Sequence, residues 1–235
     1  MSSLFNEILY RPLLNLAVYI YAVIPGQDFG IAIIILTIII RFIFLPLSIK
    51  ALKSQRSLSE LQPKMNEIKE KYKNDKTAQS AAIMQLYKDN KVNPFAGCLP
   101  LLVQLPVIFA LYAVFRDGIG SGVAGYLYPF VPHFDSINPI FLGFLDISKR
   151  NIPVIIVAGL VQWLQSKQQA ASMKVQGAGK EMAAFNNQML NFMPIMIIII
   201  GWSLPAGLML YIIATTVFSI FEQALIKKKY DQQRA

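Results

Sequence analysis

One charged residue interrupts an otherwise apolar stretch of this sequence: Arg41, which lies within residues 29–47. A guanidinium stays protonated at physiological pH, and placing one near the middle of a bilayer costs about 2.5–3.5 kcal/mol on insertion scales. A carboxylate partner would offset that cost, yet the other long apolar stretches contain no Asp or Glu before Glu222. We therefore expect Arg41 to line a water-filled cavity, in which it would hold an anionic group such as an acidic peptide segment.

Uncharged polar side chains on the other apolar stretches are candidates to line the same cavity. They are Gln104, Gln162, Tyr211, Thr215 and Thr216. Each of them could instead form an ordinary hydrogen bond between two helices. A cavity with one permanent cation and neither acid nor base is poorly equipped for catalysis, and the same charge disfavours cation conduction. The sequence therefore predicts a binding cavity in a protein that is not an enzyme.

Other residue types that carry chemistry are sparse. The chain has one cysteine, Cys98, which excludes a disulfide framework, and one histidine, His133, which excludes a His-rich metal site. Residues 120–125 have the glycine spacing of a dinucleotide-binding loop, but no predicted strand precedes them, so we interpret the match as chance. We expect no metal, no cofactor and no nucleotide.

The composition indicates an integral membrane protein. Of the 235 residues, 55% are hydrophobic and only 15% are charged, whereas about a quarter of the residues in a typical soluble domain are charged. The apolar content excludes disorder. The isoleucine runs at 33–35, 38–40 and 197–200 lack the alternation of a barrel strand. Because backbone groups in lipid must find internal partners, the sequence predicts an all-α integral membrane protein.

Five stretches are apolar enough to be helices that cross a bilayer, which requires about 20 residues. We expect these transmembrane helices at 29–47, 98–116, 151–167, 187–203 and 205–226. The last two come from one uncharged run, 182–221, which would be about 60 Å long as a single helix. Turn residues around Pro205 divide this run into a tight helical hairpin.

Basic residues are distributed unequally between the two sides of the predicted spans. Seventeen Lys or Arg lie in segments 48–97, 167–186 and 227–235, and four lie on the other side, at Arg11, Arg116, Lys149 and Arg150. Cytoplasmic segments are enriched in Lys and Arg. This places segment 48–97, the loop 168–186 and the basic tail 227–235 in the cytoplasm. The N-terminus and the connector 117–150 are then extracytoplasmic.

The extracytoplasmic segments are expected to rest on the membrane interface. Residues 12–25 are apolar but too short to cross. We expect 1–28 to be an interfacial segment anchored by Tyr10, Tyr19 and Tyr21, with a processed signal as the alternative, although it would lack a basic start. The connector 117–150 carries phenylalanines that suit the interface: Phe130, Phe134, Phe141 and Phe144.

The long cytoplasmic segment is predicted to form two helices. Apolar residues at spacings of three and four form one helical stripe: Leu58, Leu61, Met65, Ile68 and Tyr72. Asp75 provides an N-cap, and a second, shorter stripe contains Ile83, Leu86 and Tyr87. We expect an antiparallel hairpin, which either is a solvated structural unit or meets anionic lipid, the ribosome or an emerging chain.

Three groups of residues carry a family resemblance. The first is Arg41 followed by Pro46 and by Gln62-Pro63-Lys64; the second is 92–100 (VNPFAGCLP) with Gln104-Leu105-Pro106; the third is 204–211 (LPAGLMLY). In this order they resemble the YidC/Oxa/Alb membrane protein insertases, and the small outer connector resembles the minimal five-span form. Many members carry a second aromatic directly after the tyrosine, where this chain has Ile212.

The resemblance implies a groove that is open to the cytoplasm and to lipid, is closed on the outside, and has Arg41 at its centre. Expected groove residues are Arg41, Gln104, Gln162, Tyr211 and Thr215. It further implies a location in the plasma membrane of a prokaryote, with short or weakly hydrophobic nascent membrane proteins as substrates. Membrane lipids, the ribosome and the Sec translocon are the other expected partners, and no nucleic-acid sequence would be recognised. Cys98 would be a small packed residue rather than a reactive thiol.

Two other function classes remain open from the residues alone. A small polytopic transporter or channel would also need a polar cavity, although it should show coupling carboxylates or repeated halves, and the sequence shows no internal repeat. A membrane-anchored ribosome-binding or partner-binding protein would use the basic hairpin, but it would have no need of an arginine in the middle of a span.

Overall fold

The computed structural model describes residues 3–93, 99–116, 125–172 and 192–232. Most of these residues are helical. The elements are α1 Ser3–Phe5, η1 Asn6–Tyr10, α2 Arg11–Val23, α3 Phe29–Glu60, α4 Gln62–Lys71, α5 Lys76–Asp89, α6 Leu99–Arg116, β1 Ile140–Phe141, β2 Leu145–Asp146, α7 Ile152–Ser172 and α9 Ala206–Gln232. A further apolar helix occupies Phe192–Gly201. The fold is that of a mostly helical membrane protein, with one short antiparallel pair, β1 and β2, in the connector.

Two of the described helices are long and apolar enough to cross a membrane, namely α3 and the Ala206–Ile226 part of α9. Two shorter apolar helices are Gln104–Phe115, within α6, and Phe192–Gly201. α7 is 21 residues long and carries Lys167 near its end. The chain turns after Gly201, and α9 begins directly after Pro205.

α3 does not end at residue 47 but continues as one helix to Glu60, a length of about 48 Å. Leu58 therefore belongs to α3, and the predicted stripe 58–72 is divided between two helices at Leu61. The break has a local cause: Pro63 occupies the first turn of α4, where its missing N–H is tolerated, but its ring would clash with the carbonyl of Ser59 in a continuous helix.

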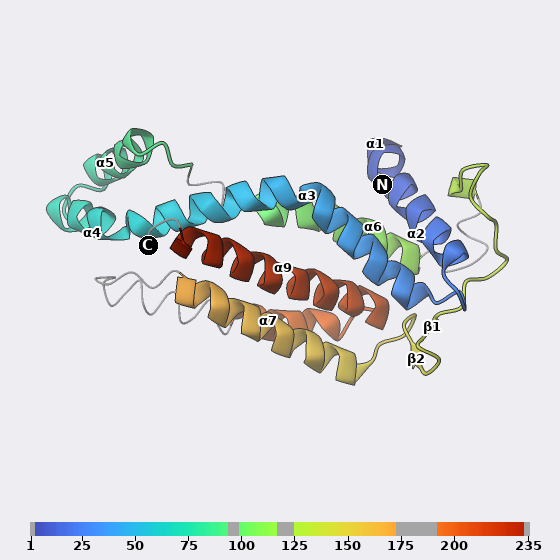
Figure 1. Cartoon of the computed structure of the whole chain (residues 1–235). Helices are drawn as coiled ribbons and strands as arrows, with labels where there is room; N and C mark the ends of the chain where they lie inside the picture. The colour runs from blue at the N-terminus through green and yellow to red at the C-terminus, as the bar shows by residue number, and fades with distance from the viewer. Residues whose placement is uncertain (1–2, 94–98, 117–124, 173–191, 233–235) are drawn as a thin grey trace.

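α9 is the central helix of the bundle, and it packs against α7 on one side and α3 on the other (Figure 1). α3 and α9 run in the same direction, starting at the end that carries α2 and the β strands (Figure 1). Two side-chain contacts define how they align. Arg41 contacts Thr215, and the Phe42 ring packs edge-on against the Phe218 ring, with 5.4 Å between the ring centroids.

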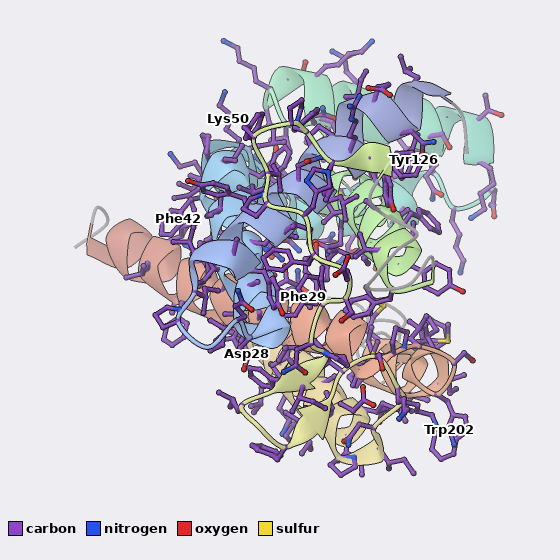
Figure 2. The ribbon with its side chains drawn as sticks, turned by 90° about the vertical axis from the view of Figure 1, so that its right-hand side faces the viewer. Asp28, Phe29, Phe42, Lys50, Tyr126 and Trp202 are labelled. Atoms are coloured by element: carbon purple, nitrogen blue, oxygen red, sulfur yellow. The ribbon has the colours of Figure 1, made fainter. Side chains whose placement is uncertain are left out.

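The end of the bundle next to α2 contains the apolar core. Phe29, Ile33 and Leu36 on α3 and Leu208 and Met209 on α9 are almost completely buried there. Figure 2, viewed from this end, shows Phe29 in the interior and Phe42 on the outer side of α3. Between helices in a membrane, such side chains stabilise the packed end through close van der Waals contact.

The start of α3 is tied to the connector. Asp28 caps the helix by accepting a hydrogen bond from the Ile31 N–H (3.0 Å), and its second oxygen accepts one from the Leu142 N–H (2.6 Å). Gly30 lies so close to the Phe141 ring that an added Cβ would overlap it. These contacts fix the position of α3 along its own axis.

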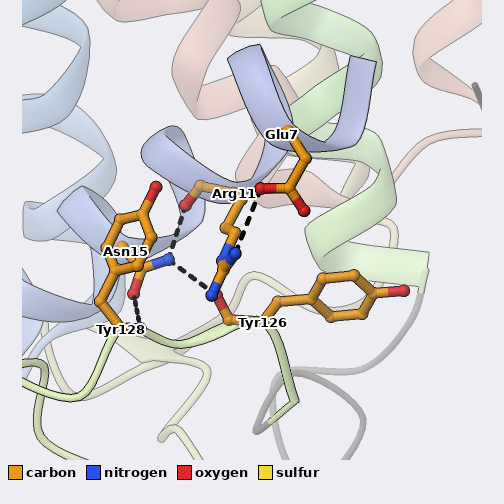
Figure 3. Close-up of polar contacts among 5 residues, drawn as sticks. All are labelled: Glu7, Arg11, Asn15, Tyr126 and Tyr128. Atoms are coloured by element: carbon orange, nitrogen blue, oxygen red, sulfur yellow. Dashed lines mark hydrogen bonds and ion pairs between the residues drawn. The ribbon is translucent and has the colours of Figure 1, made fainter. Parts of the chain in front are cut away.

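A polar cluster attaches α2 to the connector (Figure 3). The Asn15 amide donates to the Tyr126 carbonyl (2.9 Å), and its oxygen accepts from the Tyr128 N–H (2.6 Å). Arg11 forms an ion pair with Glu7 (3.1 Å) and lies over the Tyr128 ring at 4.8 Å. Because Asn15 is buried, both ends of its side chain need these backbone partners.

The aromatic anchors predicted for the outer segments are partly wrong. Tyr10 and Tyr21 are each 2% exposed, because η1 packs against α6 and α2 packs against α3 and α6, whereas Tyr19 is exposed. In the connector, Phe130 and Phe144 are exposed as expected, at 74% and 79%. The other two predicted phenylalanines pack inward: Phe134 lies against the Tyr21 ring, and Phe141 lies against Gly30.

α4 and α5 contact each other at the opposite end of the molecule (Figure 1). Asp75 caps α5, as predicted, by accepting from the N–H groups of the next turn. The Gln79 amide donates to the Lys69 carbonyl (2.9 Å), and the Tyr87 hydroxyl contacts the Met65 sulfur (3.2 Å). These pairs show that the two helices run antiparallel. Burial at this seam raises the pKa of Tyr87.

Candidate functional site

A cavity of about 400 Å³ lies between α3, α6, α7, α9 and the helix Phe192–Gly201. Its polar lining follows the helical repeat, since α3 contributes positions spaced by four or seven residues, which lie on one helix face. These are Thr37, Arg41, Ser48 and Gln55. α9 contributes a matching face with Tyr211, Thr215, Ser219 and Glu222.

Arg41 is held in this cavity by a hydrogen bond rather than by an ion pair. Its Nε donates to the Thr215 Oγ1 at 2.6 Å. Thr215 also hydrogen-bonds the Tyr211 hydroxyl, which accepts from the Gln104 amide at 2.6 Å. The resulting chain crosses from α3 through α9 to α6. Among the described residues, no carboxylate lies within ion-pair distance of the Arg41 guanidinium.

The structure brings all five residues predicted for the groove to the same cavity: Arg41, Gln104, Gln162, Tyr211 and Thr215. Gln162 reaches it from α7, where its amide donates to the Gln165 side chain at 3.1 Å. The alternative that Gln104 forms a bond between helices is also correct, since that bond links α6 to α9. Thr216 lines the cavity too, although its hydroxyl donates within its own helix to the Ile212 carbonyl. That these residues bind a substrate stays a prediction.

Sequence reasoning missed a second charged residue in the cavity lining, Glu222, and its neighbour Ser48. The Ser48 hydroxyl hydrogen-bonds the Glu222 carboxylate across the α3–α9 interface. The spacing contained a signal, because Ser48 follows Arg41 by seven residues and Glu222 follows Thr215 by seven. Two turns of helix place such residues on the same face.

The cavity occupies only one half of the bundle. Its lining begins at Thr37 on α3 and at Tyr211 on α9, whereas the preceding turns of both helices contribute to the buried apolar core, with Phe29, Ala32, Ile33, Leu36, Leu208 and Met209. The polar half therefore lies toward α4 and α5, and the apolar half lies toward α2 (Figure 1). An ion or peptide in the cavity would meet packed apolar side chains at the α2 end.

The lining can bind a charged group, but it offers little for covalent chemistry. Within the described ranges, no cluster of three or more His, Cys, Asp and Glu residues could hold a metal ion. His133 is exposed on the connector, outside the cavity lining. Cys98 and all but the last residue of the glycine pattern at 120–125 lie outside the described residues. The guanidinium is a permanent cation whose planar fork matches a carboxylate.

Sequence comparison supplies the family. Residues 19–233 match the family model described as 60Kd inner membrane protein. The chain belongs to the YidC/Oxa/Alb family of membrane protein insertases. The YidC-like segment therefore covers every helix that lines the cavity.

The curated relatives of this YidC-family chain differ in length. A membrane protein insertase YidC of Fusobacterium nucleatum is 39% identical over 202 residues, which are 86% of this chain and 87% of that protein. Insertases of the same name from Geotalea daltonii and Geobacter metallireducens are 36% and 34% identical, each over 222 residues. Those two matches cover 94% of this chain but only 37% of the length of each relative.

Proposed function

We propose that this chain guides short or weakly hydrophobic nascent membrane proteins from the cytoplasm into the bilayer. The route is a hydrophilic groove formed by the Arg41 cavity. One observation carries the proposal: a permanently charged Arg41 is held by the Thr215 hydroxyl in a cavity lined by polar and apolar side chains, with no carboxylate bound to it among the described side chains. In a membrane, an arginine that faces a cavity inside the bundle typically marks a substrate or ion pathway.

The geometry of Arg41 suits transient capture of an acidic tail. Its Nε is occupied by Thr215, and within the described chain neither Nη group has a hydrogen-bond partner. These two groups are left to bind a substrate carboxylate in the bidentate manner that a guanidinium favours. The uncharged neighbours Gln162 and Gln165 supply further donors and acceptors along the path.

We further propose five membrane spans with the N-terminus outside and the C-terminus in the cytoplasm. The polar half of the bundle then faces the cytoplasm, and the apolar half around Phe29 and Leu208 closes the outer side. This arrangement shortens the apolar barrier that an acidic tail must cross. The apolar segment that follows the tail would leave sideways into lipid.

The energy for insertion would come from the substrate and the membrane rather than from a nucleotide or a covalent reaction. Burial of a span of about 20 apolar residues in lipid is strongly favourable. The membrane potential adds about 2.3 kcal/mol per 100 mV for each negative charge that moves to the outer side. The groove has only to lower the barrier, so we propose that the chain acts as a chaperone and not as an enzyme.

The α4–α5 hairpin is proposed to recruit substrates at the cytoplasmic surface, with the ribosome, the Sec translocon and anionic lipid as candidate partners. It carries exposed basic residues and an exposed Met84, and it lies away from the main bundle (Figure 1). Replacing 62–89 by a short Gly-Ser linker should reduce substrate recruitment without unfolding the bundle. Unchanged crosslinking of nascent chains to Gln162 or Tyr211 would contradict this role.

The proposed function is tested by reconstituting the purified chain in liposomes with a newly synthesised substrate that has an acidic outer tail. Insertion is measured as protection of that tail from external protease. Arg41→Ala should abolish protection, whereas Arg41→Lys should retain much of it, because the positive charge persists. Normal insertion by the alanine variant would refute the role of the groove charge. Solute flux without protection would instead favour a transporter or channel.

A further inference from the structure

Glu222 is a buried carboxylate that the proposed capture of an acidic tail does not use. Its side chain is 6% exposed, it lines the cavity, and its Oε1 has no hydrogen-bond partner among the described residues. Ser48 satisfies only part of the carboxylate. A buried carboxylate oxygen without a protein donor is satisfied by cavity water or by a donor that a bound polypeptide brings to it.

The position of Glu222 relative to Arg41 is set by helix geometry. Arg41 and Thr215 meet at one level of the parallel α3–α9 pair, and Ser48 and Glu222 meet at a second level. Ser48 follows Arg41 on α3 by seven positions, and Glu222 follows Thr215 on α9 by seven as well. Seven residues correspond to about 10.5 Å along a helix axis at about 1.5 Å per residue. The cavity therefore presents a cation and an anion at two separate levels, with the anion nearer to α4.

The alternatives to an external occupant fit less well. Arg41 attracts Glu222 only at longer range, because its guanidinium lies beyond ion-pair distance of the carboxylate and donates to Thr215 instead. A bound metal ion would need several oxygen ligands, and the described residues contain no cluster that could supply them. A Lys or Arg side chain fits, since its head donates to the carboxylate while its stem packs on apolar lining such as Phe44 and Leu47.

We propose that Glu222 with Ser48 forms a second substrate subsite, which binds a basic residue of the entering polypeptide while Arg41 holds an acidic one. This inference rests on the proposed insertase function. Backbone levels about 10.5 Å apart along the helices correspond to about three residues of extended chain. The preferred substrate therefore carries its basic residue about three positions after the acidic one, on the cytoplasmic side, and the cavity selects chains in that orientation.

The test uses the reconstituted full chain and three substrates that differ at one position, three residues after the Asp of the acidic tail. That position is Lys, Gln or Glu. Wild-type protein should insert the Lys substrate about tenfold faster than the Gln substrate, which is the effect of one charge-assisted hydrogen bond. Glu222→Gln should bring this ratio close to one. Glu222→Lys should make the Glu substrate the preferred one, a reversal that only a folded protein can show.

Two controls make the outcomes separable. Asp135→Asn removes an exposed carboxylate from the connector, outside the cavity, and should leave the Lys-to-Gln ratio unchanged. If insertion depends on Arg41 but the ratio is the same in wild type and Glu222→Gln, this inference is refuted and the insertase function stands. If no substrate inserts faster than into protein-free liposomes, both fail.

Discussion

Thr215→Val tests whether the hydroxyl of Thr215 positions the groove charge. Valine keeps the side-chain volume but removes the acceptor of the 2.6 Å bond from the Arg41 Nε. Hydrogen bonds to charged groups contribute about 1.5–3 kcal/mol in soluble proteins, whereas pairs between membrane helices average about 0.6 and reach about 1.7 kcal/mol. Since Arg41 is charged but only partly buried, we expect a loss of about 1–1.5 kcal/mol. This corresponds to a five- to tenfold slower insertion of a substrate with an acidic tail.

A double-mutant cycle separates this bond from general packing effects. Arg41→Lys keeps the positive charge but has no Nε–H at that position, so Thr215→Val should have little further effect in the Arg41→Lys background. The readout is the initial rate at which protease-protected substrate forms in liposomes. Thr216→Val is the matched control, because its hydroxyl lines the same cavity but donates to the Ile212 carbonyl. Its effect should be the same in both backgrounds.

An equal effect of Thr215→Val with arginine and with lysine at position 41 would show that the bond does not position the charge. The reasoning would also be refuted if Thr216→Val coupled to Arg41 as strongly as Thr215→Val does. In that case the cavity volume, and not the specific hydrogen bond, would control insertion.

Three further predictions concern the scaffold. Gly207→Ala should lower the stability by about 1–3 kcal/mol, because the new methyl group overlaps the Phe115 ring, and thermal unfolding in detergent measures this. Asn15→Leu should loosen the connector by about 1–3 kcal/mol and expose it to limited proteolysis, since the Tyr128 N–H loses its acceptor and the Tyr126 carbonyl keeps only the Arg11 donor. A hydrogen bond from Ser148, aided by Lys149, holds the pKa of Asp146 below its usual value. The ionised Asp146 therefore stabilises the turn at pH values above the usual pKa of an aspartate. The turn should loosen as the pH falls through the lowered pKa of Asp146 in the folded protein. An NMR titration of Ser148→Ala should show a higher pKa for Asp146.

The location of the site could be predicted from the sequence because of one residue whose physical cost is large. Arg41 in an apolar stretch requires a polar environment, and the few polar residues on other helices are its natural neighbours. Gln104, Tyr211 and Thr215 are candidates on this ground, and the structure brings them to the same cavity. This prediction needs only the residue types and not the face on which each side chain lies.

Glu222 was not predicted, because its role depends on which way each helix faces. α3 and α9 are apolar almost all round, so their hydrophobic residues do not define a buried side. The seven-residue spacing from Arg41 to Ser48 and from Thr215 to Glu222 becomes informative only once the two helices are known to be parallel. Near the end of a predicted span, a glutamate is also compatible with an exposed surface position.

The N-terminal segment shows the opposite failure, in which residue type suggested the wrong environment. Tyrosines near a membrane surface are common anchors, but Tyr10 and Tyr21 are buried because η1 packs on α6 and α2 packs on α3 and α6. The buried positions Tyr10, Leu14 and Tyr21 lie on one helical face, which the uniformly apolar sequence obscures. Only tertiary contacts decide between protein and lipid for such a helix.

The packed end of the bundle determines which residues face the cavity at the other end. A shift of α3 by one residue would rotate its face by about 100° and turn Arg41 away from Thr215. Gly30 against Phe141 and Gly207 against Phe115 are close contacts that tolerate no such shift. Because helix rotation is transmitted along a continuous helix, the apolar half both closes the outer side in the proposed orientation and sets the register of the two charged levels. Loss of either glycine contact should therefore reduce insertion even where the cavity residues are unchanged.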